Sequence, residues 1–251
     1  MILYLASGSP RRAELLKQIA VPFSVLPAPD IDETPLPGEP PLEYVCRMAR
    51  EKDHAGAANG AVAGAVLGAD TAVVLGDEIL GKPADNAEAL AMLKALNGAE
   101  HQVMSALALL YRERTEVRYS ITRVQFRHLS EAQLQAYVAT GEGADKAGGY
   151  GIQGLGAALV ASLAGSYSGV VGLPLEQMVE LLDQVGIRYW HEDFSTGAFP
   201  TREHLMEHVC TILAKEAAAL VDAAMHRPAV LPILVTHVIK NTVVAFEEFE
   251  A

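Results

Sequence analysis

The sequence predicts a globular α/β or α+β domain, and three observations lead to this fold class. Short apolar runs typical of buried strands alternate with longer runs in which apolar residues recur at helical spacing. Prolines, glycines and asparagines separate most of these runs, as turns require. Hydrophobic residues make up 51% of the 251 residues, which is enough to fill a core.

The expected elements follow in order along the chain. Residues 2–5 form a first strand, and a helix begins after it, with Ser9 as N-cap and Pro10 at the first helical position. A second strand covers 23–26, and the loop at 27–41 is rich in proline and acidic residues. The later elements are helices at 42–57, 86–96, 130–139 and 174–185, strands at 66–67, 73–75, 103–111 and 117–126, and a glycine-rich loop at 148–156.

Charge, cysteine content and hydrophobic runs limit the expected ligands and the expected location of the protein. A net charge of -12 and a pI near 5.1 argue against nucleic-acid binding through a basic surface, while a small anion can still bind in a locally basic cleft. Cys46 and Cys210 form neither a metal motif nor a disulfide framework, which favours a reducing, cytoplasmic compartment. No signal peptide is expected, and the apolar stretch at 230–246 is too short and too polar to span a membrane.

The first candidate site joins the end of the first strand to the start of the first helix. Ser7-Gly8-Ser9 is followed by Arg11 and Arg12 in the first helical turn. Cations at this position oppose the helix dipole, so an anionic ligand would explain them, and guanidinium groups at a helix N-terminus suit phosphate. Two solvated arginines on a capped helix explain this cluster equally well when it is taken alone.

Acidic residues provide candidates for a metal site. The loop run Asp30-Ile31-Asp32-Glu33 could hold Mg²⁺ together with phosphate oxygens. Asp70, expected at a strand end within Gly68-Ala69-Asp70-Thr71, could bind a metal or take a proton from water. Lys82, between glycine and proline, could contact a phosphate as a point charge. For each residue alone, a solvated position is the simpler interpretation.

A glycine-rich segment from Asp145 to Gly154 is the last candidate. Its glycines would let backbone approach a ligand closely, and the Gln153 carboxamide offers a donor and an acceptor for a nucleobase edge. A flexible surface loop is the alternative. Together, the clusters provide cations for a triphosphate, acids for a metal and an amide that can read a base.

These segments resemble the Maf family of nucleoside triphosphate pyrophosphatases. The resemblance covers about residues 1–190, and its motifs occur in the family's order. They are LASGSPRR from Leu5, DIDE from Asp30, AREK from Ala49, GADT from Gly68, GKP from Gly81, DKAGGYGIQG from Asp145 and GSYSGVVGLPLE from Gly165. A chance match to so many ordered motifs is not credible.

The resemblance implies a mixed, twisted sheet with flanking helices around a deep cleft, similar to inosine triphosphate pyrophosphatase. It also implies a homodimer and an activity that depends on Mg²⁺ or Mn²⁺. It also implies hydrolysis of dTTP, UTP or modified pyrimidine triphosphates to the monophosphate and pyrophosphate. Arg12, Thr71 and Gln153 match the discriminating positions of the dTTP/UTP branch, and Asp70 matches its proton acceptor. The other matching residues are Asp70 and Glu33 at the metal, and Lys52, Lys82, Arg11 and Ser7 around the phosphates.

Two positions depart from the family pattern, and three other functions stay open. Asp53 follows Lys52 where alanine is usual, and Ser168-Gly169 replaces a commoner asparagine or alanine, which bears on affinity more than on activity. One alternative is a pyrophosphatase for methylated or purine triphosphates, which Gln153 argues against. Another is a nucleotide-binding regulator of cell division without turnover, which would not need the proton acceptor Asp70. The third is a bifunctional chain.

The sequence predicts a Maf-like domain at 1–190 and a C-terminal extension of unknown role at 191–251. The extension has a helical pattern followed by a β-branched run. His204 and His208 match the zinc-protease pattern H-x-x-E-H and would share one helix face. Such a match arises easily by chance in a helix rich in histidine and glutamate, so a solvated helix face is the expected explanation.

Overall fold

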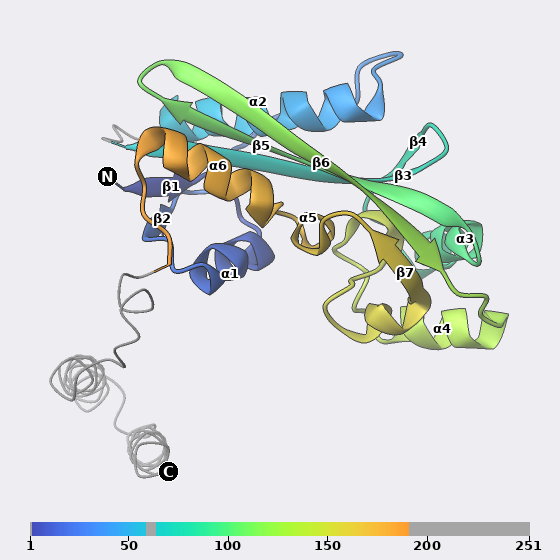
Figure 1. Cartoon of the computed structure of the whole chain (residues 1–251). Coiled ribbons are helices and arrows are strands. Elements are labelled where there is room, and N and C mark those ends of the chain that lie inside the picture. The colour runs from blue at the N-terminus through green and yellow to red at the C-terminus, as the bar shows by residue number, and fades with distance from the viewer. Residues whose placement is uncertain (1, 59–63, 191–251) are drawn as a thin grey trace, which may run out of the picture. The chain divides into compact units, whose positions relative to one another are not determined.

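A computed structural model describes residues 2–58 and 64–190 of the chain (Figure 1). The chain divides into two units, Met1–Trp190 and His191–Ala251. The predicted extension, with His204 and His208, lies outside the described residues, and its boundary and role stay predictions. Within the described ranges, no helix is long and apolar enough to cross a membrane.

The domain is built on a seven-stranded mixed sheet, which confirms the predicted fold class. Its strand order is β2-β1-β3-β5-β6-β7, and β4 pairs with β3 beside this path. Parallel pairing joins β1 to β2 and β3, and all other pairs are antiparallel. The strands are β1 Leu3–Leu5, β2 Phe23–Val25, β3 Ala65–Leu75, β4 Glu78–Leu80, β5 Glu100–Tyr111, β6 Arg114–Phe126 and β7 Val160–Ala164.

Helices cover both faces of the sheet (Figure 1). The long helix α2 lies along one face, and α1, α5 and α6 lie along the other, with α3 and α4 towards the end of the sheet that carries β7. The helices are α1 Pro10–Gln18, α2 Pro41–Ala58, α3 Asn86–Leu96, α4 Glu131–Ala139, α5 Tyr167–Val171 and α6 Leu175–Val185, and two short 3₁₀ turns occupy Ala147–Gly149 and Leu155–Leu159.

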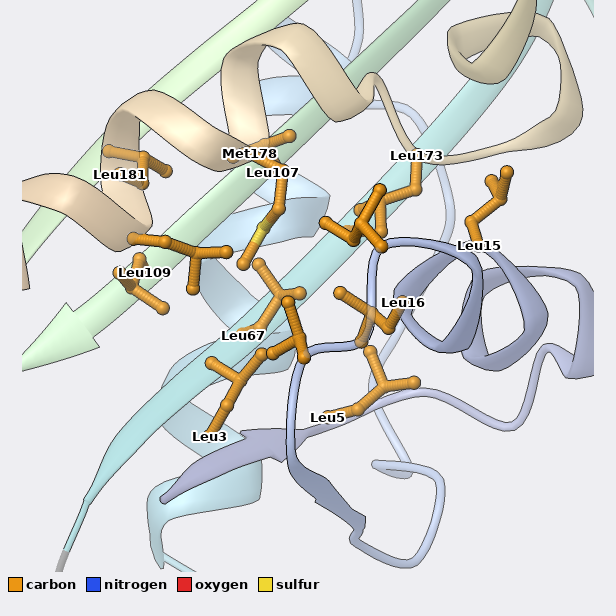
Figure 2. Packing of buried hydrophobic residues seen from close by; sticks show 14 of the residues in the cluster. Leu3, Leu5, Leu15, Leu16, Leu67, Leu107, Leu109, Leu173, Met178 and Leu181 are labelled. Atoms are coloured by element: carbon orange, nitrogen blue, oxygen red, sulfur yellow. The ribbon is translucent and has the colours of Figure 1, made fainter. Parts of the chain in front are cut away.

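Three apolar clusters fix these layers. The first joins leucines of β1, β3 and β5 to α1 and α6, with Leu3, Leu5, Leu16 and Leu67 fully buried at its centre (Figure 2). The second packs α3 and α4 against the same sheet face further along, and the third packs α2 on the opposite face. Burial of these side chains is the main favourable contribution to folding.

Local signals predicted most elements, and their failures have identifiable causes. The helix at 86–96 has the predicted bounds, and Ser130 caps α4 with a capping box. Ser9 occupies the N-cap position of α1, but its side chain makes no capping hydrogen bond. The short elements β4, β7 and α5 were not predicted.

Candidate active site

The site is built around an unpaired stretch in strand β3. One edge of β3 pairs with β5 at residues 66–74. The opposite edge pairs with β1 at residues 65–67 and with β4 at residues 73–75. In the part of the chain that the structure describes, no strand pairs with residues 68–72 on this second edge. The sheet therefore has an opening beside Asp70 and Thr71.

A cavity of about 1080 Å³ lies at this opening. All nine residues that the family resemblance matched to a site line it, although they come from six segments of the chain, whereas Asp30 and Asp32 of the acidic loop run do not. The nine residues are Ser7, Arg11, Arg12, Glu33, Lys52, Asp70, Thr71, Lys82 and Gln153. The expected meeting of acids and cations in one cleft thus agrees with the geometry, while the role of each residue stays a prediction.

On the α2 side of the sheet, one lysine bridges two carboxylates. Lys52 Nζ lies 2.7 Å from Asp70 Oδ1 and 2.7 Å from Glu33 Oε1. Lys52 and Asp70 are each only 8% exposed, so solvent screens their attraction weakly. Burial opposes ionisation of Glu33, but its hydrogen bond to Lys52 and the charges of Lys52, Lys82 and Arg12 lower its pKa. The Glu33 carboxylate is therefore in the field of all three cations.

The position of Asp70 differs from the prediction. The sequence left Gly68 to Thr71 between two strands or within one, and Asp70 was interpreted as a strand-end acid; the structure places it in the middle of β3, which runs unbroken from Ala65 to Leu75. A glycine is needed at position 68 of the strand because α2 packs directly on it. A Cβ at Gly68 would overlap the carbonyl oxygen of Ala49 in α2. Close packing of helix on strand thus brings Lys52 within hydrogen-bonding distance of Asp70.

On the opposite sheet face, Arg12 is held by three hydrogen bonds. Its Nε donates to the Gly172 carbonyl at 2.9 Å, Nη1 to Ser7 Oγ at 3.1 Å and Nη2 to Thr71 Oγ1 at 3.4 Å. Burial lowers the Arg12 pKa, and the Asp70 charge opposes this effect. The guanidinium is therefore oriented in the cavity before any ligand binds.

The hydroxyl of Thr71 has a fixed direction. Ser105 Oγ lies 2.6 Å from the Gly169 carbonyl, which can only accept, so Ser105 donates its single proton there. Thr71 Oγ1 lies 2.8 Å from Ser105 Oγ and 3.5 Å from the Gly172 carbonyl, so its proton goes to the nearer acceptor, Ser105. Since Arg12 donates to the same oxygen, Thr71 offers the cavity an acceptor and no donor.

The other predicted residues lie on the rim of the cavity. Arg11 forms an ion pair with Asp145 at 3.7 Å. Lys82 is exposed in the segment that follows β4, and Gln153 is exposed in the glycine-rich segment. The structure thus separates a buried centre, formed by Arg12, Lys52 and Asp70 with their partners, from an accessible rim.

Sequence reasoning missed several residues of the cavity. The Tyr44 hydroxyl donates to the Glu33 carbonyl at 2.9 Å, and burial together with the Asp70 and Glu33 charges raises the pKa of Tyr44 to about 12. Lys146 and Glu142 also line the wall. Ser105 does not line the cavity but bonds to Thr71, and its place as a polar residue within an apolar strand could have identified it. The basic residue in the DKAGGYG motif could have identified Lys146.

Asp53 does not act as its sequence position suggested. It was expected to place a negative charge beside Lys52 at the phosphates, but it is fully buried and does not line the cavity. Its Oδ1 contacts the His54 ring, and its Oδ2 is buried without a hydrogen-bond partner. Successive residues of α2 point about 100° apart, so the neighbour of a cavity residue faces elsewhere.

The donor set suits a hard divalent cation that substrate helps to bind. Asp70 and Glu33 provide carboxylate oxygens at the cavity, and Mg²⁺ commonly uses one or two carboxylates with phosphate oxygens and water. No group of three or more His, Cys, Asp or Glu residues among the described residues could hold a metal by itself. The two carboxylates therefore fit a metal that arrives with a phosphate ligand.

Sequence comparisons place this arrangement in a known family. A sequence model described as "Maf-like protein" matches residues 2–185. A dTTP/UTP pyrophosphatase of Alcanivorax borkumensis is 68% identical over 193 residues, which cover 77% of this chain and 100% of the relative. A protein of the same name from a Shewanella species is 55% identical, and the match covers 75% of this chain and 100% of that protein.

Among solved structures, the similarities are weaker. A HAM1 protein of Coxiella burnetii has a TM-score of 0.43 at 18% identity, and the match covers 73% of this chain and 99% of that one. A nucleoside-triphosphatase, dITP/XTP pyrophosphatase, of Mycobacterium abscessus has a TM-score of 0.34 at 16% identity, and the match covers 51% and 76%. The family assignment rests on the sequence comparisons: by the match over residues 2–185 and by its full-length coverage of these relatives, the chain belongs to the Maf family.

Proposed function

We propose that this chain is a nucleoside triphosphate pyrophosphatase that hydrolyses dTTP and UTP to the monophosphate and pyrophosphate. The observation that carries the proposal is the convergence of Lys52, Asp70, Glu33 and Arg12 on one cavity at the opening in the sheet. The two relatives named dTTP/UTP pyrophosphatase, covered over their whole length, support this choice of substrate.

The cations of the cavity bind the triphosphate. Arg12 is oriented by Ser7 and Gly172, so little reorganisation is needed when phosphate arrives. Lys52 provides charge from the α2 side, and Lys82 and Arg11 provide it from the rim. Asp70 and Glu33 would hold Mg²⁺ or Mn²⁺, which would supply further neutralisation of the phosphate charge.

Asp70 acts on the attacking water. Its carboxylate accepts a proton as the water oxygen bonds to the α-phosphorus, and the bond to the bridging oxygen breaks to release pyrophosphate. Lys52, 2.7 Å from Asp70 Oδ1, orients the carboxylate for this role. Positioning and charge stabilisation therefore account for most of the catalysis.

Pyrophosphate release from a panel of nucleoside triphosphates, with and without Mg²⁺, tests the activity. In the same assay, Asp70→Asn should fold normally and lose roughly a thousandfold in kcat, because an amide cannot accept the proton. Thermal unfolding checks the fold of the variant. Normal turnover in Asp70→Asn would refute its role, and nucleotide binding without pyrophosphate release by the wild type would favour a regulator.

Gln153 reads the base in this proposal. Its carboxamide can both donate to and accept from the edge of uracil or thymine. Gln153→Ala should therefore reduce the preference for UTP and dTTP over other triphosphates, with a smaller effect on the metal dependence. An unchanged ranking of substrates would contradict this role.

The family resemblance also supports a homodimer, and the sparse, widely spaced cysteines support a cytoplasmic location. Light scattering on the purified full chain tests the first of these proposals. A mass of one chain at micromolar concentration would contradict it.

A further inference from the structure

Glu142 holds the backbone at the C-terminal end of the glycine-rich segment that carries Gln153. Its Oε1 accepts from the Leu155 backbone N–H at 2.7 Å, and its Oε2 accepts from the Gly156 N–H at 2.8 Å and from the Tyr137 hydroxyl at 2.8 Å. One side chain at the start of the segment thus holds backbone thirteen and fourteen residues later.

Tyr137 extends this arrangement to the middle of the segment. Its hydroxyl oxygen accepts from the Gly151 N–H at 3.1 Å while its proton goes to Glu142. Gly154 permits the close approach, because a Cβ at this position would overlap Glu142 Oε1. Backbone on both sides of Gln153 is therefore fixed to a single pair of side chains.

The Glu142 carboxylate is suited to this role. Burial opposes its ionisation, but the hydrogen bonds from Gly156, Tyr137 and Leu155 outweigh burial and lower its pKa. An ionised acceptor forms hydrogen bonds about twice as strong as a neutral one. The segment is thus held by charge-assisted bonds.

Gln153 depends on this backbone for its position. Its side chain is exposed at the cavity, and no described residue forms a hydrogen bond with the carboxamide. Its neighbour Ile152 packs against the core cluster that includes α1 and α6, which sets the direction of the segment. The carboxamide is therefore placed by its backbone, which Glu142 and Tyr137 hold and which the packing of Ile152 supports.

We propose that Glu142 is a positioning residue for base recognition, which acts by holding Gln153 at the cavity. The inference rests on the proposed function, since it assigns the reading of the base to Gln153. It adds a residue outside the predicted site and a mechanism, which is the preorganisation of a recognition loop by a single carboxylate.

Glu142→Gln is the sharpest test, because it keeps the shape of the side chain but turns one acceptor into a donor. The ratio of kcat/KM for UTP to that for CTP should fall by roughly tenfold, the value of one lost charge-assisted hydrogen bond. The kcat for UTP should change far less. The matched control is Glu131→Gln, which removes an exposed carboxylate of α4 that pairs with Lys94 and leaves the cavity untouched.

A double-mutant cycle separates positioning from a general structural effect. In a Gln153→Ala background, Glu142→Gln should lower the UTP-to-CTP ratio no further, and hydrogen exchange at the Leu155 and Gly156 amides should be faster than in wild type. If Glu142→Gln fails to fold, Tyr137→Phe carries the same expectation, because it removes a donor to Glu142 and the acceptor for Gly151.

The outcomes distinguish this inference from the proposed function. An unchanged UTP-to-CTP ratio in the variant, or an equal loss with every triphosphate, would overturn the role of Glu142 while wild-type activity stands. An additive loss in the Gln153→Ala background would also overturn it. Absence of pyrophosphate release by the wild-type chain would instead refute the proposed function itself.

Discussion

Two buried titratable groups, Asp53 and His101, make the stability of this fold depend on pH in opposite directions. Removing one of them should therefore reveal the effect of the other on stability. Asp53 is fully buried, and burial raises its pKa from 3.8 to about 6 against the opposing contact with His54. The folded state therefore holds this proton more tightly than the unfolded state, so stability falls as the pH rises from about 4 to about 6. The resulting cost above this range is about 3 kcal/mol.

His101 acts in the reverse direction over nearly the same range. It is buried between Phe126 and Tyr150, and burial lowers its pKa from 6.5 to about 4. The unfolded state then binds the proton more tightly, so stability is lost as the pH falls from 6.5 to about 4. This loss is also about 3 kcal/mol, and the two effects largely cancel in the wild type.

Asp53→Ala removes the group whose ionisation lowers the stability of the fold as the pH rises. Its stability relative to wild type should rise by about 3 kcal/mol between pH 4 and pH 7, because only the wild type has the buried charge. His101→Gln, which can still bond to the Tyr150 hydroxyl, should gain relative to wild type as the pH falls. Urea unfolding followed by circular dichroism between pH 4 and pH 8 measures both differences.

The pH dependence is decisive, because each substitution also changes packing by an amount that does not vary with pH. Asp77→Ala, which removes an exposed carboxylate in the turn after β3, is the control and should differ from wild type almost equally at every pH. A difference between Asp53→Ala and wild type that stays constant from pH 4 to pH 8 would refute the argument.

Two further substitutions test the two faces of the site. Lys52→Met leaves the Asp70 and Glu33 carboxylates without their shared cation and should reduce kcat/KM by at least about a hundredfold. A rate of pyrophosphate release within tenfold of wild type would contradict this role of Lys52. Ser105→Ala removes the acceptor that orients Thr71, so selectivity among bases should fall and the unfolding free energy should decrease by about 1–3 kcal/mol. Thermal melts and substrate ratios measure both effects, and unchanged selectivity would count against the fixed hydroxyl.

The elements that local sequence could predict are those with their own capping and periodicity. Helix α3 has an apolar face, and Asp85 is its N-cap, with a side chain that accepts a hydrogen bond from the Glu88 backbone N–H. The bounds of the helix therefore follow from nearby residues. Strand β7 has mostly exposed side chains and exists because it pairs with the end of β6, more than thirty residues earlier. Helix α5 has five residues and depends on the Ser166 cap. Neither has a periodic pattern long enough to detect.

The same limit applies to the candidate site. Family motifs selected nine residues that now line one cavity, but they could not show how those residues are held. Ser105 has no motif of its own, and its importance comes from lying directly opposite Thr71 in the β3–β5 register. Glu142 likewise acts through hydrogen bonds to backbone beyond the glycines. Such roles depend on pairing between distant segments, which a local pattern does not contain.

The opening in β3 explains how adjacent residues serve one ligand from two sides of a sheet. Side chains alternate along a strand, so Asp70 faces Lys52 in α2 while Thr71 faces Arg12 in α1. A continuous sheet would keep these two groups apart. Because β1 ends its pairing at Leu67 and β4 begins at Val73, the edge between them is unpaired and both side chains reach the same cavity. Cations from both faces can therefore surround one polyanion, even in a chain whose net charge is -12.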